Sequence, residues 1–308
     1  MRHSAAVQVR KESEESRVDA SPFLKWAGGK SAIADRIHSL LPGDVRERVY
    51  REPFLGGGAM FFYLQPQKAI LSDTVKSLIE TYKMVQKQAE LLIHRLEKLR
   101  VAHTEAHFYE IRERFNKDRS AEVLDRAAWL IYLNKTCYNG LFRTNKSGEF
   151  NVPVGRFVNP RVVDPDKLRV AAGLLSRAKL KHATFDDLVK DAEPDDMIYL
   201  DPPYDPISKT SSFAGYAEGG FGREDQERLA ETFRLLDERG CILALSNSDT
   251  ELVRRLYTGF DFSPIIAPRA ISSKSATRGE VSELLIRNFA KYPVSKLYSV
   301  PRSRRISG

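Results

Sequence analysis

Four consecutive residues, Asp201-Pro202-Pro203-Tyr204, carry the clearest chemical signal in the chain. An aromatic amine such as the N6 amine of adenine is a poor nucleophile because its lone pair is delocalised into the ring. Acceptors that hold both N–H bonds favour the pyramidal nitrogen that attack requires, and the Asp201 carboxylate and Pro202 carbonyl can be those acceptors. The proline rings restrict the backbone, so both oxygens are aimed in advance. The tetrapeptide therefore predicts an amine site, with Tyr204 as a face for stacking an extruded base.

The element that must position this loop is the strand before it. Met197-Ile198-Tyr199-Leu200 is an apolar run of the buried-strand type and leads directly into Asp201. Open α/β sheets bind their ligands at the carboxyl ends of such strands. Two prolines can also simply end a strand and form an ordinary turn, and the tetrapeptide alone leaves that alternative open.

A second candidate site is the segment Glu52-Pro53-Phe54-Leu55-Gly56-Gly57-Gly58, between an expected strand at 49–51 and an expected helix at 59–64. Its glycines let the backbone approach a bound nucleoside closely. Asp73 ends the next expected strand, at 69–73, where a carboxylate can accept hydrogen bonds from both hydroxyls of a ribose. Alternatively, the glycines ease helix packing and Asp73 caps the following helix. The order of these elements predicts a nucleotide-binding α/β sheet.

The segment Phe23-Leu24-Lys25-Trp26-Ala27-Gly28-Gly29-Lys30-Ser31 could be mistaken for a phosphate-binding loop. That motif requires a glycine six residues before its lysine, and Leu24 stands there, so an ATPase is not favoured. Trp26 offers an aromatic face and Lys30 a cation, which suit a cofactor carrying a sulfonium and a carboxylate. Trp26 could instead be a core side chain. The segment predicts a glycine turn and a helix that begins near Ser31.

Composition limits the class of protein. The 308 residues, 42% hydrophobic and 29% charged, indicate a soluble globular protein with either one large domain or a main domain that carries an insertion. No apolar stretch is long enough to span a bilayer. Cys137 and Cys241 have neither the spacing of a zinc site nor that of a disulfide framework, so no metal is expected. A formal charge of +8 favours a polyanionic partner. We expect a cytoplasmic protein with no membrane partner.

The rest of the chain divides into segments of different character. Residues 1–20 indicate a disordered leader and residues 291–308 a mobile basic tail. From Val75 to about Leu133 the apolar spacing predicts several helices. Residues 138–158 contain the turn dipeptides Asn139-Gly140 and Ser147-Gly148, which predict a hairpin. A further buried strand is expected from Cys241 to Leu245.

Taken together, these segments resemble the DNA adenine methyltransferase (Dam) family. The resemblance runs from about Phe23 to Asn288. The order of cofactor loop, recognition segment and DPPY is typical of the alpha arrangement, and an acid before the two prolines resembles the adenine-N6 enzymes rather than the cytosine-N4 ones. The matching pieces are FLKWAGGK at 23–30, EPFLGGGAMFFYL at 52–64, Asp73, NKTCYNGLFRTNKSGEFNVPVGRF at 134–157, DPPY at 201–204, SNSDT at 246–250 and RAISSKSATRGEVSELL at 269–285.

The resemblance implies an α/β, Rossmann-like methyltransferase sheet with an inserted, mostly helical DNA-recognition domain that carries a β-hairpin. The catalytic domain would comprise 21–74 and 167–290, and the recognition domain 75–166. The implied activity is site-specific adenine-N6 methylation of double-stranded DNA by a prokaryotic or phage-encoded enzyme. It would move a methyl group from S-adenosylmethionine to a flipped adenine, release S-adenosylhomocysteine and need no metal. We expect the enzyme to be a monomer.

The family's functional residues are carried over onto matching positions. Arg143 matches an arginine that reads guanine, and a guanidinium fork fits guanine O6 and N7 in the major groove. Leu141 and Pro153 match apolar positions near a thymine methyl, and Lys25 matches a lysine that contacts the first guanine, which together favour GATC as the recognition sequence. The DNA-binding residues implied are Lys25, Asn139, Leu141, Arg143, Asn151, Pro153 and Arg156. The cofactor-binding residues implied are Trp26, Lys30, Phe54, Gly56, Gly58, Asp73, Phe185, Asp187 and Asp201.

Two further readings of different class stay open at this point. The chain could be a DNA-binding module that kept the fold and lost catalysis, but the intact DPPY and glycine loop speak against decay. It could also methylate adenine in RNA. The major groove of RNA is too deep and narrow for an arginine-bearing hairpin, which favours duplex DNA.

Overall fold

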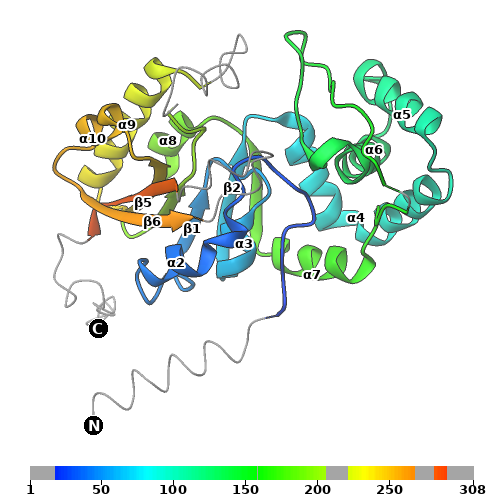
Figure 1. The fold of residues 1–308 in the computed structure, drawn as a ribbon. Helices are drawn as coiled ribbons and strands as arrows, with labels where there is room; N and C mark the ends of the chain where they lie inside the picture. Colours follow the sequence, from blue (N-terminus) through cyan, green and yellow to red (C-terminus); the bar gives the residue numbers. More distant parts are fainter. Residues whose placement is uncertain (1–17, 158, 206–220, 268–280, 290–308) are drawn as a thin grey trace, which may run out of the picture. The chain divides into compact units, whose positions relative to one another are not determined.

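The computed structural model describes residues 18–157, 159–205, 221–267 and 281–289, which are drawn in colour in Figure 1. They form two compact units. The first comprises the described residues up to Ala34 together with Leu55–Gln65 and Leu71–His182, and the second comprises Asp35–Phe54, Pro66–Ile70 and the described residues from Ala183 onward. The expected leader up to residue 17, the matching segment at 269–280 and the expected basic tail lie outside the described residues.

Helices and strands alternate along most of the described chain. The helical elements are η1 Lys30–Ala32, α2 Ala34–Ser39, α3 Ala59–Leu64, α4 Lys76–Val101, α5 Glu105–Lys117, α6 Val123–Thr136, η2 Tyr138–Gly140, α7 Pro165–Leu175, η3 Phe185–Asp187, α8 Leu188–Asp191, α9 Arg223–Glu238 and α10 Glu251–Leu256. The strands are β1 Val49–Glu52, β2 Lys68–Asp73, β3 Ala178–His182, β4 Met197–Leu200, β5 Ile242–Ser248, β6 Asp261–Ala267 and β7 Val281–Arg287.

The seven strands form one sheet in the order β3-β2-β1-β4-β5-β7-β6. β4 lies between β1 and β5 and runs parallel to both, with Met197 opposite Tyr50 and Leu200 opposite Leu245. β7 is antiparallel to both β5 and β6. A mostly parallel sheet whose strands are connected by helices is the Rossmann-like fold, so the expected fold class is confirmed.

The core of the second unit lies between the sheet and the helices α8, α9 and α10, which Figure 1 shows beside β5 and β6. All four residues of β4 and all seven of β5 are buried, which explains the apolar runs at 197–200 and 242–245. α9 contributes a single buried face, because its core residues recur at helical spacing. Those residues are Leu229, Ala230, Phe233 and Leu236.

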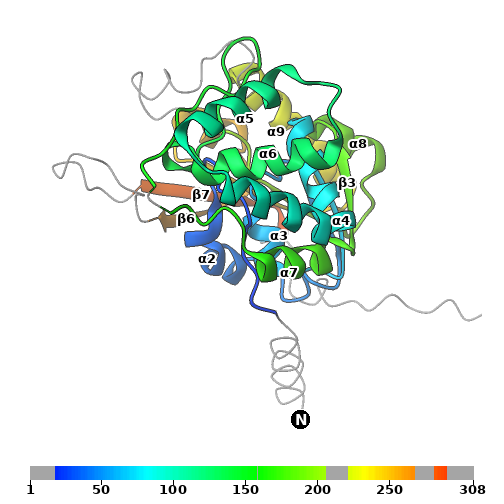
Figure 2. The ribbon, with the colours of Figure 1, turned by 90° about the vertical axis from the view of Figure 1, so that its right-hand side faces the viewer.

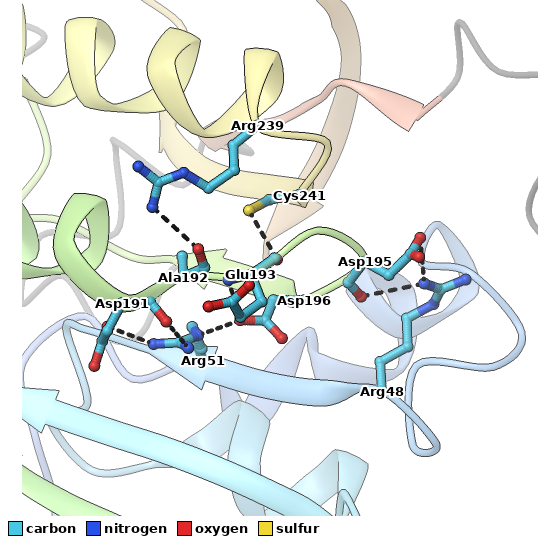
Figure 3. A network of polar contacts seen from close by, with 9 residues as sticks. All are labelled: Arg48, Arg51, Asp191, Ala192, Glu193, Asp195, Asp196, Arg239 and Cys241. Carbon is cyan, nitrogen blue, oxygen red and sulfur yellow. Dashed lines mark hydrogen bonds and ion pairs between the residues drawn. The ribbon is translucent and has the colours of Figure 1, made fainter. Parts of the chain in front are cut away.

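A polar network holds the segment 191–196, which connects α8 to β4 (Figure 3). Arg51 of β1 donates from Nε to Asp196 Oδ2 over 2.6 Å and from one terminal nitrogen to Asp191 Oδ1 over 2.7 Å. The side chains of Arg51 and Asp196 are only 5% and 6% exposed, so each charge has its partner inside the protein. Cys241 adds a contact from its Sγ to the Glu193 carbonyl oxygen. The network fixes the start of β4 against β1.

The first unit is built around α6, which Figure 2 shows beside α4 and α5. α6 is buried around nearly its whole circumference, as its apolar stretch Ala127–Leu133 requires. The expectation of several helices between Val75 and Leu133 is confirmed by α4, α5 and α6. α5 begins at a Thr104 cap, whose hydroxyl oxygen accepts a hydrogen bond from the His107 N–H over 3.1 Å.

Two local expectations were wrong in detail. The helix expected to begin near Ser31 is a single 3-10 turn, η1, and the α-helix α2 begins only at Ala34. The hairpin expected within 138–158 contains no regular strand. It is a loop closed by two isolated antiparallel bridges, Cys137 to Val154 and Thr144 to Phe150. Side chains replace the missing ladder, because Asn116 bonds both the N–H and the carbonyl of Phe150.

Candidate active site

The DPPY loop begins directly after β4, in the second unit. Pro202 is buried, and one carboxylate oxygen of Asp201 is also buried. The hydroxyl of Tyr204 donates a hydrogen bond of 2.8 Å to Glu283 Oε2 on β7. Burial, and next the negative charge of Asp201, raise the pKa of Tyr204 well above its ordinary value. Tyr204 is therefore a neutral, anchored ring near the Asp201 carboxylate.

The end of β5 supports the same loop with polar side chains that are buried. Ser246, Asn247 and Ser248 are each at most 2% exposed, and such groups need hydrogen-bond partners. The Ser246 hydroxyl bonds the Tyr199 hydroxyl over 2.8 Å. The Asp205 N–H donates to Asn247 Oδ1 over 3.2 Å, and the Ser248 hydroxyl donates to the Asp205 carbonyl over 2.6 Å. The strand end thus fixes the residue that follows DPPY.

An aromatic cluster in the second unit contains two of the predicted cofactor residues. The rings of Phe54 and Phe185 are stacked with centroids 5.7 Å apart, and Phe221 packs edge-on against Phe54. Asp187, by contrast, bonds to residues of its own turn and helix. Its carboxylate accepts hydrogen bonds from the Thr184 N–H and from Lys190 Nζ, and these bonds lower its pKa. The structure thus brings Phe54 and Phe185 together, while Asp187 caps the turn that carries Phe185.

In the first unit, Asp73 holds the glycine turn. Its Oδ2 accepts a hydrogen bond from the Gly56 N–H and its Oδ1 one from the Val75 N–H, each over 2.9 Å. The cap residue of α4 is Val75, so Asp73 supports the start of that helix from two positions before the cap. Burial raises the pKa of Asp73, although the backbone donors oppose that shift. The Thr74 N–H is a third backbone donor to this carboxylate. A carboxylate has about four acceptor positions, so one remains for a ligand.

The glycine turn has no room for a side chain beside Trp26. Gly56 has φ of +47°, and a Cβ there would lie 2.7 Å from Trp26 Cδ1. Gly58 also adopts a positive φ, of +68°. Trp26 is half-buried and stacks on Phe142 with ring centroids 4.8 Å apart. The Trp26 ring therefore packs against the glycine turn and is not fully enclosed in the core.

Lys30 is buried, with 4% of its surface exposed. Its Nζ donates a hydrogen bond of 2.5 Å to the Gly28 carbonyl oxygen. A buried ammonium needs acceptors, and a ligand carboxylate is one that suits it.

A cavity of 380 Å³ in the first unit is lined by residues from three distant segments. They include Lys25, Trp26, Gly57, Asn139 and Leu141. The buried side chain of Asn134 joins two of these segments, because it bonds the N–H and the carbonyl of Lys25 and also the Gly140 carbonyl. Three predicted DNA contacts and one predicted cofactor contact therefore share one cavity.

The remaining predicted DNA contacts lie on the loop between the two isolated bridges or just beyond it. Arg143 donates from Nε to Asn151 Oδ1 over 2.8 Å, which orients its guanidinium. Arg143, Pro153 and Arg156 are exposed, as contacts to DNA must be. Tyr138 was not predicted as a site residue, and its side chain is 53% exposed beside Asn139. A tyrosine next to a turn dipeptide gave no signal of that exposure.

Lys135, near the end of α6, has a pKa that the sequence did not lead us to expect. Burial, and then the positive charges of Lys167 and Lys25, lower its pKa to about 8. The only sequence signal was its position within the matching segment at 134–157.

The described residues contain no group of three or more His, Cys, Asp or Glu side chains that could hold a metal ion. Among the described helices, none combines the length and the apolar character needed to cross a membrane.

Comparison with known proteins agrees with these features. Residues 26–271 match the family described as D12 class N6 adenine-specific DNA methyltransferase. The chain is 40% identical over 289 residues to the type II methyltransferase M.MjaIII of Methanocaldococcus jannaschii, covering 88% of this chain and all of that one. It is 36% identical over 283 residues to the type II methyltransferase M1.LlaDCHI of Lactococcus lactis, covering 90% and 98%. It is 36% identical over 265 residues to the DNA adenine methylase of Escherichia coli, covering 85% and 93%.

The match covers well over half of the chain, and the relatives are covered almost completely. The chain therefore belongs to the D12 class of N6 adenine-specific DNA methyltransferases. The family relation confirms the resemblance to Dam that the sequence motifs indicated.

Proposed function

We propose that this methyltransferase transfers a methyl group from S-adenosylmethionine to the N6 amine of an adenine that has been flipped out of duplex DNA, and that its site is GATC. The observation that carries the proposal is the DPPY loop at the carboxyl end of β4, anchored through Tyr204 to Glu283. The family relation gives the reaction, and the loop offers the acceptors that the reaction needs.

The Asp201 carboxylate and the Pro202 carbonyl are proposed to accept one N6–H bond each. Holding both hydrogens aligns the nitrogen lone pair away from the ring, which makes the amine a better nucleophile. The nitrogen forms a bond to the methyl carbon as the carbon–sulfur bond breaks, and the sulfonium becomes a neutral thioether. The methylated nitrogen is then strongly acidic and gives one N–H proton to solvent water, so no further base is needed.

The first unit offers groups that fit such a cofactor. Asp73 is proposed to accept from the ribose hydroxyls, since its carboxylate has an acceptor position beyond those used by the Gly56, Val75 and Thr74 N–H groups. The buried Lys30 ammonium suits the cofactor carboxylate. The absence of a Cβ at Gly56 and Gly58 lets the turn approach a nucleoside. The cofactor supplies an electrophilic methyl group, and these residues bind and orient it. Phe54, Phe185, Asp187 and Trp26 are proposed to complete its binding site.

Methylation within a duplex requires that the target base leave the stack. Tyr204 is proposed to stack on the extruded adenine, because its hydroxyl is held and its ring orientation is therefore limited. The exposed ring of Tyr138 can enter the base stack and lower the cost of extrusion.

Residues 75–166 are proposed to form the DNA-recognition domain. Arg143, oriented by Asn151, is suited to a bidentate contact with guanine. Leu141 and Pro153 supply apolar contact to a thymine methyl, and Lys25 is proposed to contact the first guanine. The remaining contacts, from Asn139 and Arg156, are expected to position the DNA. We also propose that the protein acts as a monomer in the cytoplasm of a prokaryotic cell.

A transfer assay with tritium-labelled S-adenosylmethionine tests the reaction on duplex DNA, on RNA and without nucleic acid. Incorporation into N6-methyladenine of duplex DNA alone is expected. Asp201→Ala is expected to abolish transfer while DNA still binds, and full turnover by that variant would contradict the proposed chemistry. Plasmid from cells expressing the protein, digested with enzymes that need or are blocked by methylated GATC, tests the site. Unmodified GATC sequences in methylated plasmid would contradict the site alone.

A further inference from the structure

A chain of buried side-chain amides connects α9 and β5 to the DPPY loop. Gln226 of α9 and Asn247 of β5 are 1% and 0% exposed. Gln226 donates from Nε2 to the Pro203 carbonyl oxygen over 2.9 Å. Asn247 donates from Nδ2 to Gln226 Oε1 over 3.0 Å, and its Oδ1 accepts from the Asp205 N–H over 3.2 Å. The two amides therefore contact the loop on both sides of Tyr204.

Neither side-chain amide can exchange the places of its oxygen and nitrogen without losing hydrogen bonds. Asn247 Oδ1 also accepts from the Ser248 N–H over 2.8 Å, so its oxygen must face the backbone donors and its nitrogen must face Gln226. That arrangement leaves Gln226 Oε1 as the acceptor and directs Nε2 to Pro203. The end of β5 thus determines which atom of Gln226 meets the loop.

The bond to Pro203 constrains the carbonyl of Pro202 as well. The ring of Pro203 fixes its φ, so the two proline carbonyls are related through one free dihedral, the ψ of Pro203. Gln226 holds the Pro203 carbonyl and thereby restricts that dihedral. The Pro202 oxygen is the proposed second acceptor of the target amine, and its direction is the quantity that Gln226 controls.

We propose that Gln226, oriented by Asn247, is a positioning residue for methyl transfer that aims the Pro202 carbonyl at the adenine amine. The inference rests on the proposed role of the DPPY loop. Because Gln226 acts through the loop and touches neither substrate, its loss slows the chemical step without weakening the binding of cofactor or DNA. Misplacement of a reacting group by about 1 Å can cost about 100-fold in rate.

Gln226→Met tests the inference, since methionine keeps the length of the side chain and removes both hydrogen-bonding groups. On a duplex that the wild-type protein methylates, the single-turnover rate constant is expected to fall by about 10- to 100-fold. The dissociation constants of S-adenosylmethionine and of the duplex are expected to change by no more than about twofold. Thr232→Val on the same helix is the matched control, because Thr232 is also buried, at 5% exposed. The Thr232→Val protein should be less stable but should keep the wild-type rate of methyl transfer.

Gln226→Glu distinguishes a positioning role of Gln226 from a packing role. It also tests the inference if the Gln226→Met protein fails to fold. Glutamate keeps an acceptor for Asn247, but it can donate to the Pro203 oxygen only when protonated. The ratio of the variant rate to the wild-type rate is therefore expected to rise as the pH falls. A ratio that is constant with pH, or a Gln226→Met rate equal to wild type, overturns the inference.

Asp201→Ala in the same assay distinguishes a failure of the positioning role of Gln226 from a failure of the proposed function. If that variant is inactive while Gln226→Met retains the full rate, only the positioning role fails. If Asp201→Ala retains turnover, the proposed function itself fails.

Discussion

The backbone N–H of Gly56 donates to Oδ2 of Asp73 over 2.9 Å, and this bond ties the glycine turn to the end of β2. The other carboxylate oxygen holds the N–H of Val75. One side chain therefore supports two backbone segments and still has an acceptor position for a ligand. A residue in this position affects both the shape of the cofactor turn and the contacts available to a ribose.

Asp73→Asn is expected to weaken S-adenosylmethionine binding. The amide provides one oxygen where the carboxylate provides two, and hydrogen bonds to a charged group contribute about 1.5–3 kcal/mol. The dissociation constant should rise by about 10- to 150-fold, as measured by isothermal titration calorimetry. Ser39→Ala, at an exposed site on α2, serves as a control that should leave binding unchanged. Wild-type affinity in Asp73→Asn would remove the ribose role of Asp73.

Arg143→Ala is expected to reduce discrimination at one base pair. A bidentate arginine–guanine contact contributes about 1–3 kcal/mol of discrimination. Competition between matched duplexes and duplexes changed at a single guanine measures this quantity. Asn151→Ala should produce a smaller loss, because it frees the Arg143 guanidinium without removing it. If the Arg143→Ala protein discriminates as well as wild type, another residue reads that guanine.

DNA affinity is expected to fall as the pH rises through about 8, the pKa of Lys135. Burial lowers this pKa below its ordinary value, so the ammonium is charged below about pH 8 and neutral above it, and only the charged form attracts a phosphate. The groups facing Lys135 are Lys25, Lys167, Arg161 and Asp164. Fluorescence anisotropy with labelled duplex at fixed salt, from pH 7 to about 9, follows the change.

Two variants identify Lys135 as the source of that pH dependence. Lys135→Arg stays charged throughout the range and should bind DNA with little dependence on pH. Lys135→Gln should bind weakly at every pH, with the salt dependence reduced by about one phosphate contact. An unchanged pH profile in Lys135→Arg would assign the effect to another group.

Arg51→Met is expected to lower the free energy of unfolding by about 3–5 kcal/mol, because it leaves the buried Asp196 carboxylate without its cation (Figure 3). Urea denaturation followed by circular dichroism measures the loss. Arg95→Met is the comparison. The side chains of Arg95 and its partner Asp125 are 40% and 34% exposed, so Arg95→Met should lose only about 1 kcal/mol or less. Equal losses in the two variants would mean that burial of the pair does not matter.

Local sequence patterns were sufficient for the elements that carry the glycine and DPPY motifs. The expected helix at 59–64 is α3 and the expected strand at 197–200 is β4, each with the predicted bounds. The strand expected to end at Leu245 continues to Ser248. Its last three residues are polar but buried, because partners from other elements satisfy their hydrogen bonds. A sequence pattern records polarity and not the presence of such a partner.

The support of the DPPY loop depends on contacts that are distant in sequence. Gln226 and Glu283 lie 23 and 79 residues from their partners Pro203 and Tyr204. Gln226 did carry one signal, since it precedes Leu229, Ala230 and Phe233 at the spacing of a buried helix face. Glu283 carried none, because its place opposite Ser248 follows from the antiparallel pairing of β7 with β5.

Because of that pairing, Tyr204 is synthesised well before the carboxylate that holds it. The carboxylate that holds Tyr204 belongs to β7, the last described strand, although DPPY is synthesised some eighty residues earlier. A nascent polypeptide that has emerged from the ribosome only through β5 contains all four DPPY residues and lacks the anchor for its tyrosine. Incomplete translation products are therefore expected to leave the chromosome unmodified.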